Sequence, residues 1–383
     1  MAAPEARPYR VHQRVFGTLG PRESVYALDA ALAPGGAAVA VPLSSGEVKL
    51  YAAGDLAYVG GLEGHTAALN DLCWASPTAA LTASADGSAV AWDTRSCSAT
   101  FTLRVAPGTE ATAVATNAGA GGHLVVVGSS KGVLSLFDSR TGKRVGAFEE
   151  SHGEPITALE FAGAGALVSA GTDGLACVFD VEHSATDEDE ALQSVLNTNS
   201  SVARMGFCDL QAGDAGALWL TTHVETLQVW DWRQGSMVAA LEDARKEVAA
   251  RLFPAACVAE EDVYLVGCHS APGGGLCLTA GSADGNVALF PVSAEPARAG
   301  EACGAAALAA ATTLLSGGED SHTTVVRGLA RSADGLLYTA GEDGALCMWA
   351  PGAASAGDGA GDSRSGGADK RRGEGSARRM SPY

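Results

Sequence analysis

The chain has 383 residues, 47% of them apolar and 18% charged, so it can bury a large core as one repeat domain or two ordinary domains. Its net charge is −19, and residues 15–350 carry −23 because the two ends, 1–14 and 351–383, carry +2 each. Such an acidic segment repels phosphate backbones, which argues against nonspecific nucleic-acid binding by it.

The cysteines and the first residues indicate where the protein works. Nine cysteines, an odd number without a CxxC pair, argue against a disulfide framework. The start, Met-Ala-Ala-Pro-Glu-Ala-Arg, lacks the apolar core of a secretory signal. We therefore expect a reducing, intracellular setting, either the cytoplasm or the nucleus. The apolar stretch 305–315 is too short to span a bilayer, so we expect no membrane association.

In chain order, residues 1–9 are expected to be flexible, and residues 10–17 form a strand-like run ahead of everything that repeats. Seven segments of short β-patterned runs follow, joined by turns that contain Gly or Asp. Their bounds are about 25–60, 69–105, 111–148, 156–196, 202–241, 248–315 and 325–349. Each segment has one aromatic anchor in its third β-run: Tyr51, Trp92, Phe137, Phe179, Trp230, Phe290 and Trp349.

Four of these anchors lie six residues after the Asp of an Asp-Gly pair. The four Asp residues are Asp86, Asp173, Asp284 and Asp343. Asp-Gly suits a tight hairpin because glycine adopts positive φ without a Cβ clash. Four short antiparallel strands, repeated at roughly 40–45 residues, match a propeller blade. The sequence therefore predicts an all-β fold, a seven-bladed β-propeller over residues 10–350.

The two ends of the chain bear on how this propeller closes. The seventh segment stops after three strands, because the Gly/Ala/Ser-rich residues 351–383 cannot pack and are expected to be a disordered tail. We predict that residues 10–17 pair with the third strand of the last segment, since closure removes an exposed sheet edge. The basic groups Lys370–Arg372 and Arg378–Arg379 are either a nuclear-import or nucleic-acid-contacting segment or a plain solvated end.

The second segment, with His65, Asp86 and Trp92-Asp93, closely resembles the WD-repeat family. The resemblance implies a hydrogen-bonded network of a His before the first strand, a Ser or Thr on the second strand, the turn Asp and the Trp. A buried carboxylate needs such donors, or it costs several kcal/mol. The candidate network residues are His65, Thr82 or Ser84, Asp86 and Trp92; His152, Ser169, Asp173 and Phe179; Asp284; and His322, Thr339, Asp343 and Trp349.

Segments one, three and five depart from this pattern, since they have Ser45-Gly46, Lys131-Gly132 and Val224-Glu225 where the Asp is expected. Further stretches of the chain resemble one particular group within the WD-repeat family. This resemblance implies a propeller fold without enzymatic activity. These stretches are Val178–Val181, Asp187–Ala191, Asn199–Val202, Thr222-His223 and Asp243–Val248, together with Gly341–Asp343, Trp349–Pro351 and the basic tail.

Motifs typical of catalysis are incomplete. Gly128–Gly132 matches G-x-S-x-G, but a nucleophile elbow needs a strand-turn-helix context, and a hairpin turn fits better here. His152-Gly153-Glu154 lacks the P-C-x-x-C partner of a zinc deaminase. The His and Cys residues show no zinc spacing, so we expect no catalytic residue, no metal and no cofactor.

We therefore expect a non-catalytic scaffold, monomeric by itself, that binds partner proteins on the propeller faces. The acidic body favours basic segments as partners. Two alternatives stay open: an enzyme that uses the central channel, and a reader of modified peptides through an aromatic cage, for which Trp74, Trp219 and Trp232 are the candidates. The sequence does not identify the partner-binding residues.

Overall fold

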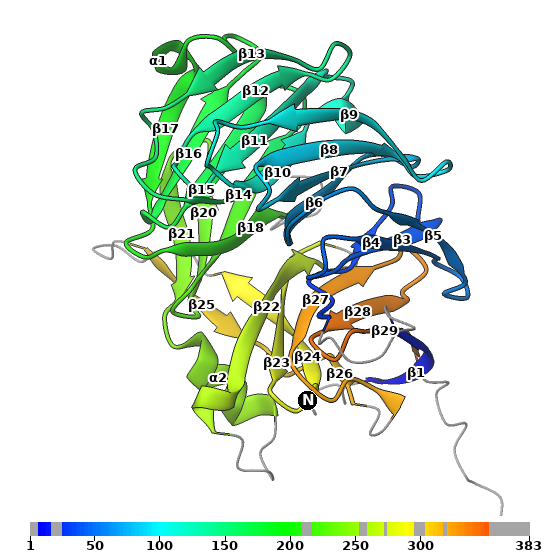
Figure 1. Ribbon diagram of the computed structural model, residues 1–383. Helices are drawn as coiled ribbons and strands as arrows, with labels where there is room; N and C mark the ends of the chain where they lie inside the picture. Colours follow the sequence, from blue (N-terminus) through cyan, green and yellow to red (C-terminus); the bar gives the residue numbers. More distant parts are fainter. Residues whose placement is uncertain are drawn as a thin grey trace, which may run out of the picture. The chain divides into compact units, whose positions relative to one another are not determined.

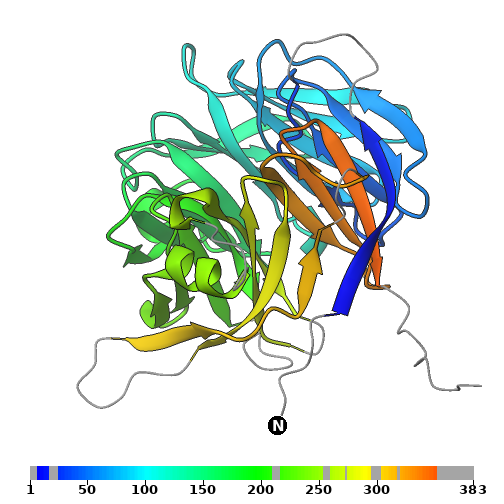
Figure 2. The same ribbon diagram turned by 90° about the horizontal axis from the view of Figure 1, so that it is seen from below.

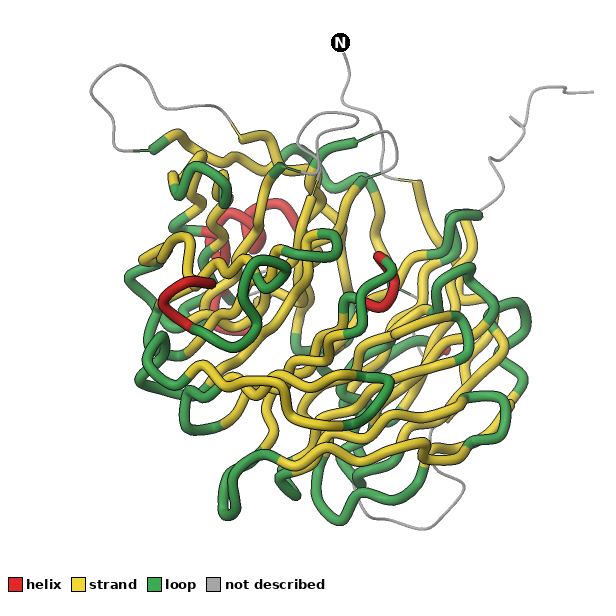
Figure 3. Tube along the Cα trace, turned by 90° about the horizontal axis from the view of Figure 1, so that it is seen from above, coloured by secondary structure: helices red, strands yellow, loops and turns green. Residues whose placement is uncertain are grey.

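The computed structural model describes residues 7–16, 25–208, 216–252, 259–271, 274–294, 303–316 and 320–351. The chain divides into a large unit, residues 1–352, and a small unit, residues 353–383. The small unit lies outside the described residues, as do residues 352–383 of the predicted disordered tail and residues 1–6 of the predicted flexible start. Pro351, the first residue of the predicted tail, belongs instead to the last strand. Strands make up most of the large unit, and helices are short (Figure 3). No helix in the described ranges is long and apolar enough to cross a membrane.

Four segments each fold into a separate four-stranded antiparallel sheet, which we call a blade (Figure 1). Blade one has β2 (Ala31–Leu32), β3 (Ala38–Pro42), β4 (Val48–Ala52) and β5 (Tyr58–Leu62). Blade two has β6 (Leu69–Ser76), β7 (Ala79–Ser84), β8 (Ser88–Asp93) and β9 (Ser98–Arg104). Blade three has β10 (Ala111–Thr116), η1 (Ala118–Ala120), β11 (Leu124–Ser129), β12 (Leu134–Asp138) and β13 (Lys143–Phe148). Blade four has β14 (Ile156–Ala162), β15 (Ala166–Gly171), β16 (Leu175–Asp180), α1 (Glu188–Ala191) and β17 (Leu192–Asn197).

The last three blades are joined into one thirteen-stranded hydrogen-bonded sheet. Blade five has β18 (Val202–Cys208), β19 (Ala217–Thr222), β20 (Leu227–Asp231) and β21 (Ser236–Leu241). Blade six has β22 (Val263–Ser270), β23 (Leu276–Ser282), β24 (Val287–Ala294), β25 (Gly304–Leu308) and β26 (Thr313–Leu315). Blade seven has β27 (Val326–Arg331), β28 (Leu337–Gly341), β29 (Ala345–Pro351) and β1 (Arg7–Phe16). The fold is the predicted all-β, seven-bladed propeller.

The first strands of the blades line the centre of the ring. Contacts run from β6 to β10, β14, β18, β22 and β27 in turn, and β27 contacts β2 of blade one. Blade one reaches blade two through β3 and β6, which completes the circle. Because every blade contributes one strand here, side chains far apart in the sequence meet in the centre.

The N-terminal strand closes the ring, as predicted. β1 pairs antiparallel with β29, with Val11 opposite Trp349 and Phe16 opposite Ala345 (Figure 2). The strand begins at Arg7, a little before the predicted residue 10, and its first residues also pair in parallel with β26. The pairing covers the edge of β29, which would otherwise offer unpaired backbone groups to another chain.

The core lies between neighbouring blades. All seven anchor aromatics are buried, and Phe179, Phe290 and Trp349 are fully buried. Leu50 of blade one packs with Leu69 and Trp92 of blade two, and Phe148 of blade three packs with Phe179 of blade four, with ring centroids 4.9 Å apart. Burying one such side chain contributes about 1.5–3 kcal/mol, so the blades stabilise one another.

The prediction for the start of the sixth segment was wrong. A strand was expected from Val248, but residues Ala244–Leu252 form helix α2. Ala, Arg, Lys and Glu predominate there and favour helix, and Arg251 forms an ion pair with Glu247 one turn earlier. Helix η2 (Glu260–Asp262) then leads into β22. The outer edge of β24 is shared by two short strands, β25 and β26, instead of one continuous strand.

The acidic run of blade four, Asp187–Glu190, lies between its last two strands, and most of it is helical. Asp187 caps α1, because its carboxylate accepts a hydrogen bond from the Glu190 N–H at 3.2 Å. Glu188 accepts hydrogen bonds from the backbone N–H groups of Glu149 and Glu150 in blade three. This part of the run is therefore tied to the neighbouring blade.

Candidate functional site

Blade two contains a hydrogen-bonded chain of four side chains from its entry, turn and strands. The Asp86 carboxylate accepts a hydrogen bond from His65 Nδ1 at 2.9 Å, and the other ring nitrogen of His65 lies 2.8 Å from the Thr82 hydroxyl. The Trp92 indole N–H donates to the same hydroxyl at 2.9 Å. This chain links the entry of the blade, its turn and its third strand.

Asp86 itself is held by several donors. Its carboxylate also accepts hydrogen bonds from the Ser88 hydroxyl at 2.5 Å and the Thr66 N–H at 3.0 Å. Burial raises the pKa of Asp86, but the hydrogen bonds from Ser88, Thr66 and His65 outweigh it and lower that pKa to about 2. The adjacent Gly87 has a φ of +79°, and a Cβ there would lie 2.7 Å from the Thr109 carbonyl oxygen. Glycine is therefore needed both for the turn and for the approach of blade three.

Blade seven repeats the arrangement and adds the closing strand to it. His322 lies 2.9 Å from Asp343 and 2.8 Å from the Thr339 hydroxyl, which also accepts from the Trp349 indole at 2.7 Å. Arg14 of β1 donates to the Asp343 carboxylate at 3.1 Å. Burial raises the pKa of Asp343, but the hydrogen bonds and the charge of His322 lower it overall. The turn carboxylate thus also anchors the strand that closes the ring.

Blade four has the shorter form of the network. His152 lies 3.0 Å from Asp173 and 2.7 Å from the Ser169 hydroxyl. Phe179 occupies the place of the tryptophan and is fully buried, but its ring has no N–H to donate. The Ser169 hydroxyl therefore does not accept an indole hydrogen bond of the kind that Trp92 donates to Thr82 in blade two.

Two candidate network residues have other roles. Ser84 is buried, but its hydroxyl donates to the backbone carbonyls of Ala67 and Ala68 and so supports the turn outside the His–Thr–Trp chain. Asp284 of blade six is exposed on its turn, in contrast to Asp86 and Asp343. The spacing to the anchor is the same, so spacing alone does not bury such a carboxylate.

Blade five uses residues that the sequence pattern did not single out. The Trp230 indole donates to the Gln228 side-chain carbonyl at 3.1 Å, and the Gln228 amide donates to the Thr198 carbonyl at 3.0 Å. Glu225, at a φ of +63°, accepts from the Leu265 N–H of blade six at 2.6 Å. A polar residue two positions before the tryptophan on the same strand was the available signal for Gln228.

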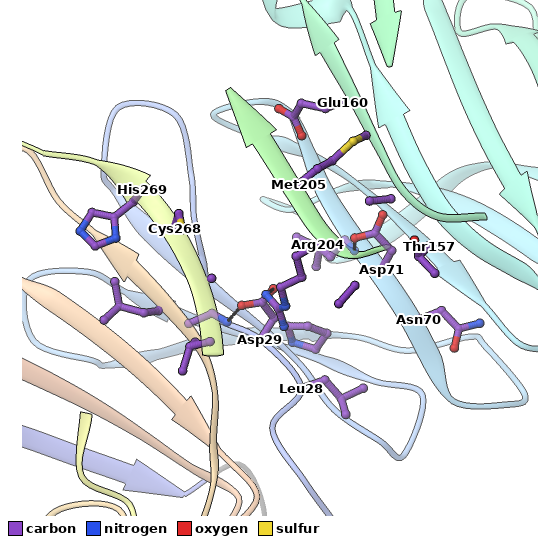
Figure 4. A pocket seen from close by; sticks show the side chains of 18 of the residues that line it. Leu28, Asp29, Asn70, Asp71, Thr157, Glu160, Arg204, Met205, Cys268 and His269 are labelled. Carbon is purple, nitrogen blue, oxygen red and sulfur yellow. Dashed lines mark hydrogen bonds and ion pairs between the residues drawn. The ribbon is translucent and has the colours of Figure 1, made fainter. Parts of the chain in front are cut away.

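The strands at the centre of the ring line a cavity of about 450 Å³ (Figure 4). Its apolar lining comes from several blades and includes Leu69, Leu159, Met205 and Leu329. Its charged lining comprises Asp29, Asp71, Glu160 and Arg204, and His269 and Cys268 lie on β22. The lining therefore combines charged and apolar residues, so the alternative of an enzyme in the central channel stays open.

Arg204 spans one side of the cavity. Its guanidinium, on blade five, lies 3.3 Å from the Asp29 carboxylate of blade one and donates to the Arg327 carbonyl of blade seven at 2.9 Å. Blade six lies between these blades, and a Cβ at its Gly267 would lie 3.8 Å from the Arg204 side chain. A Cβ at Gly328 would lie 2.0 Å from the Asp29 carboxylate, so a side chain there would displace this ion pair.

Asp71 and Glu160 lie on β6 and β14, and both have raised pKa values. The Asp71 carboxylate accepts hydrogen bonds from the Leu72 and Val114 N–H groups, each at 2.8 Å, but burial outweighs them and raises its pKa to about 6. Burial and the charge of Asp71 raise the pKa of Glu160 to about 7. The Glu160 side chain is accessible through the cavity, although protein surrounds it on nearly every side.

The remaining titratable groups of the lining are not set up for nucleophilic chemistry. Burial lowers the pKa of His269 to about 4, so its ring is neutral near pH 7. Burial raises the pKa of the Cys268 thiol well above its ordinary value, which keeps it protonated. Within the described ranges, no group of three or more His, Cys, Asp or Glu residues is placed to hold a metal ion.

The aromatic-cage candidates lie apart. Trp219 is the one tryptophan, tyrosine or phenylalanine among the described residues of the cavity lining. The Trp74 indole donates to the Ala31 carbonyl, and Trp232 packs on Phe207 with ring centroids 5.6 Å apart. The cavity therefore does not offer the several aromatic faces that a methylated lysine requires.

Gly128–Gly132 lies at the end of β11 and in the turn to β12, and a strand follows it where a nucleophile elbow needs a helix.

The sequence patterns did not single out Asp71 and Glu160. Each is a charged residue inside an otherwise mostly apolar first strand of a blade, and that contrast was the available signal.

Comparisons with known proteins agree with this fold. The family model "WD domain, G-beta repeat" matches residues 56–93. The chain is 34% identical over 329 residues to the WD repeat-containing protein GTS1 of Arabidopsis thaliana. The aligned region covers 82% of this chain and 78% of that protein. It is 29% identical over 219 residues to the WD repeat-containing protein 89 homolog of Dictyostelium discoideum, which covers 56% of each chain. That homolog represents the group within the family that the further stretches of the sequence resemble.

A solved structure supports the architecture as well. A chain in the crystal structure of the mitotic checkpoint complex superposes with a TM-score of 0.66 over 91% of this chain and 96% of that chain. Because the two sequences are 16% identical, this likeness shows the fold alone.

Proposed function

We propose that this chain, which belongs to the WD-repeat family, is a non-catalytic scaffold that binds basic segments of partner proteins at the face of its propeller. Propellers of this family generally serve as protein-interaction scaffolds. A closed ring presents a rigid face and loops of free composition, which suits the holding of other macromolecules.

The observation that carries the choice of partner is the distribution of charge. Residues 15–350 carry −23, and in the described lining of the central cavity three carboxylates stand against one guanidinium. Complementary charge speeds the encounter with basic partners and disfavours acidic ones. Such binding weakens as salt increases, because the Debye length falls from about 10 Å at 0.1 M salt to about 3 Å at 1 M.

Affinity purification of the tagged chain, followed by mass spectrometry, tests the proposal. We expect partners enriched in Lys- and Arg-rich segments that elute as the salt concentration is raised. Recovered proteins that match a tag-only control, or that lack basic segments, would count against it. We also propose a location in the cytoplasm or nucleus, which imaging of a fluorescent fusion with and without residues 364–383 tests.

A second candidate is an enzyme that uses the central cavity, and one observation favours it. Carboxyl groups with pKa values of about 6 and 7, as in Asp71 and Glu160, suit general acid–base catalysis near neutral pH. The same values also arise wherever carboxylates are crowded together without a cation. We favour the scaffold because the lining residues described above include no activated nucleophile.

A further inference from the structure

The cavity contains more carboxylate than the surrounding protein neutralises. Arg204 forms its ion pair with Asp29, and it attracts Asp71 only through space. His269 is neutral near pH 7, because burial lowers its pKa to about 4. Within the described lining, Asp71 and Glu160 therefore have no ion-pair partner, and each raises the free energy of the other when both are ionised.

These two carboxylates differ in how firmly they are held. Two backbone N–H groups, from Leu72 and Val114, orient Asp71. Glu160 forms no hydrogen bond with the described residues, and its side chain faces the cavity (Figure 4). One side chain is therefore preoriented, whereas the other is free to move toward a bound cation.

The walls around this pair suit a particular shape of ligand. Leu28, Leu72 and Leu329 line the same cavity and are only partly buried, so they offer some apolar surface to a ligand. A straight methylene chain that ends in a charge matches this combination, since such chains bury the stem and keep the charged end in a polar place. The volume of about 450 Å³ is ample for one long side chain.

We propose that the cavity binds the ammonium group of a lysine side chain, presented by a basic segment of a partner protein, between Asp71 and Glu160. This inference rests on the scaffold function proposed above and names the chemistry that one site of that scaffold recognises. The methylene stem of the lysine packs against Leu72 and the other partly buried apolar residues of the lining. No covalent step is involved.

An ammonium group fits this site better than the other cations do. It is compact, with three donors in different directions, so it can bridge two carboxylates that come from different blades. A guanidinium prefers both oxygens of a single carboxylate in one plane. A trimethylated lysine has no N–H to donate, and Trp219 offers it only one aromatic face.

Isothermal titration calorimetry with a capped Gly-Gly-Lys-Gly-Gly peptide tests the site on the full chain. The matched probe has norleucine in place of lysine, which keeps the stem and removes the charge. We expect heat of binding with the lysine peptide and at least tenfold weaker binding with the norleucine peptide, because a hydrogen-bonded charge is lost. Equal binding of the two peptides, or no heat with either at 10 mM peptide, would overturn the proposal.

Variants then locate the binding. Glu160→Gln and Asp71→Asn should each weaken the lysine peptide about tenfold or more, whereas Glu154→Gln, an exposed acid at the entry to the same blade, should leave it unchanged. Both channel variants remove a charge that is unfavourable in the folded protein, so they are expected to fold. Unchanged affinity in Glu160→Gln and Asp71→Asn would refute the site.

Spermidine separates a peptide lysine from a free polyamine. If spermidine binds with the same dependence on Glu160 while the lysine peptide does not bind, the ligand is a free polyamine and the proposed peptide lysine is wrong.

The affinity purification should be repeated with Glu160→Gln. Retained partners, together with lost peptide binding in the titration, support the lysine site as one of several contacts. Retained partners with unchanged peptide binding refute the site but leave the scaffold in place, and absence of partners from the unsubstituted chain refutes the scaffold itself.

Discussion

Carboxyl groups in the blade turns and in the central cavity have opposite pKa shifts, because their surroundings differ. Asp86 is 12% exposed and surrounded by donors, and its pKa falls to about 2. Glu160 is accessible to solvent through the cavity, yet it lacks a donor among the described residues, and its pKa rises to about 7. Enclosure by protein raises the pKa of each carboxyl group, and the donors within reach decide whether that rise is reversed, as it is at Asp86, or remains, as it does at Glu160. A carboxylate of the first kind holds the fold together, whereas one of the second kind is ready for a ligand.

Removal of the closing strand should destabilise the fold most, because one of the turn carboxylates, Asp343, anchors that strand. Deletion of residues 1–18 removes β1, its pairing with β29 and the Arg14–Asp343 ion pair. We expect the melting temperature to fall by about 10 °C, since an open ring loses a whole strand of backbone bonds and packing. An unchanged melting curve by circular dichroism would show that the ring does not depend on this strand.

Asp86→Ala should have the next largest effect. It removes the acceptor for His65, Thr66 and Ser88 and leaves those donors inside the blade. The loss of charged hydrogen bonds predicts a decrease of roughly 2–4 kcal/mol in the free energy of unfolding, which is about 5 °C in melting temperature.

The matched control is Asp93→Ala, also in blade two. Asp93 pairs with the exposed Arg95, so its removal should change the melting temperature much less. If the two variants melt within about 1 °C of each other, the buried network does not act as described.

Acid should remove the contribution of Asp86 in a defined range. Because its pKa is lower in the folded chain than the ordinary 3.8, its stabilisation is fully present above about pH 4 and is lost as the pH falls through about 2. Urea unfolding of the unsubstituted chain and of Asp86→Asn should therefore differ at pH 6 and converge toward pH 2. A difference that is the same at both pH values would contradict the lowered pKa.

Glu160→Gln should have the smallest effect and the opposite sign. A raised pKa means that ionisation of Glu160 costs the folded state free energy as the pH rises from the ordinary 4.5 to about 7, and the cost is complete above that. Solvent that reaches the side chain reduces this cost. We expect the variant to melt about 1–2 °C higher at pH 8 and no higher at pH 4, with Glu154→Gln unchanged at both. A lower melting temperature at pH 8 would show that Glu160 stabilises the fold.

The architecture could be predicted because its signals are local. The Asp-Gly turn and the anchor six residues later lie within one blade, so Asp86 and Trp92 could be placed from spacing. The role of His65 came from the resemblance to the WD-repeat family. The closing strand could be inferred because the last segment is one strand short. The same local reading failed at Val248, where helix-forming residues outweigh the β-pattern, and at Asp284, which keeps the spacing to its anchor but is exposed on its turn.

The seven-bladed ring follows from local sequence signals, because each blade is a short hairpin-linked unit whose turns and buried anchors are encoded within about 40–60 residues. The composition of the cavity depends on how the blades assemble. Asp71, Glu160 and Arg204 come from the first strands of three blades, and Asp29 lies just before the first strand of blade one. They meet solely because the ring closes. Their pKa values depend on the distance to neighbours and on enclosure by protein, and neither is set by any one segment of the chain.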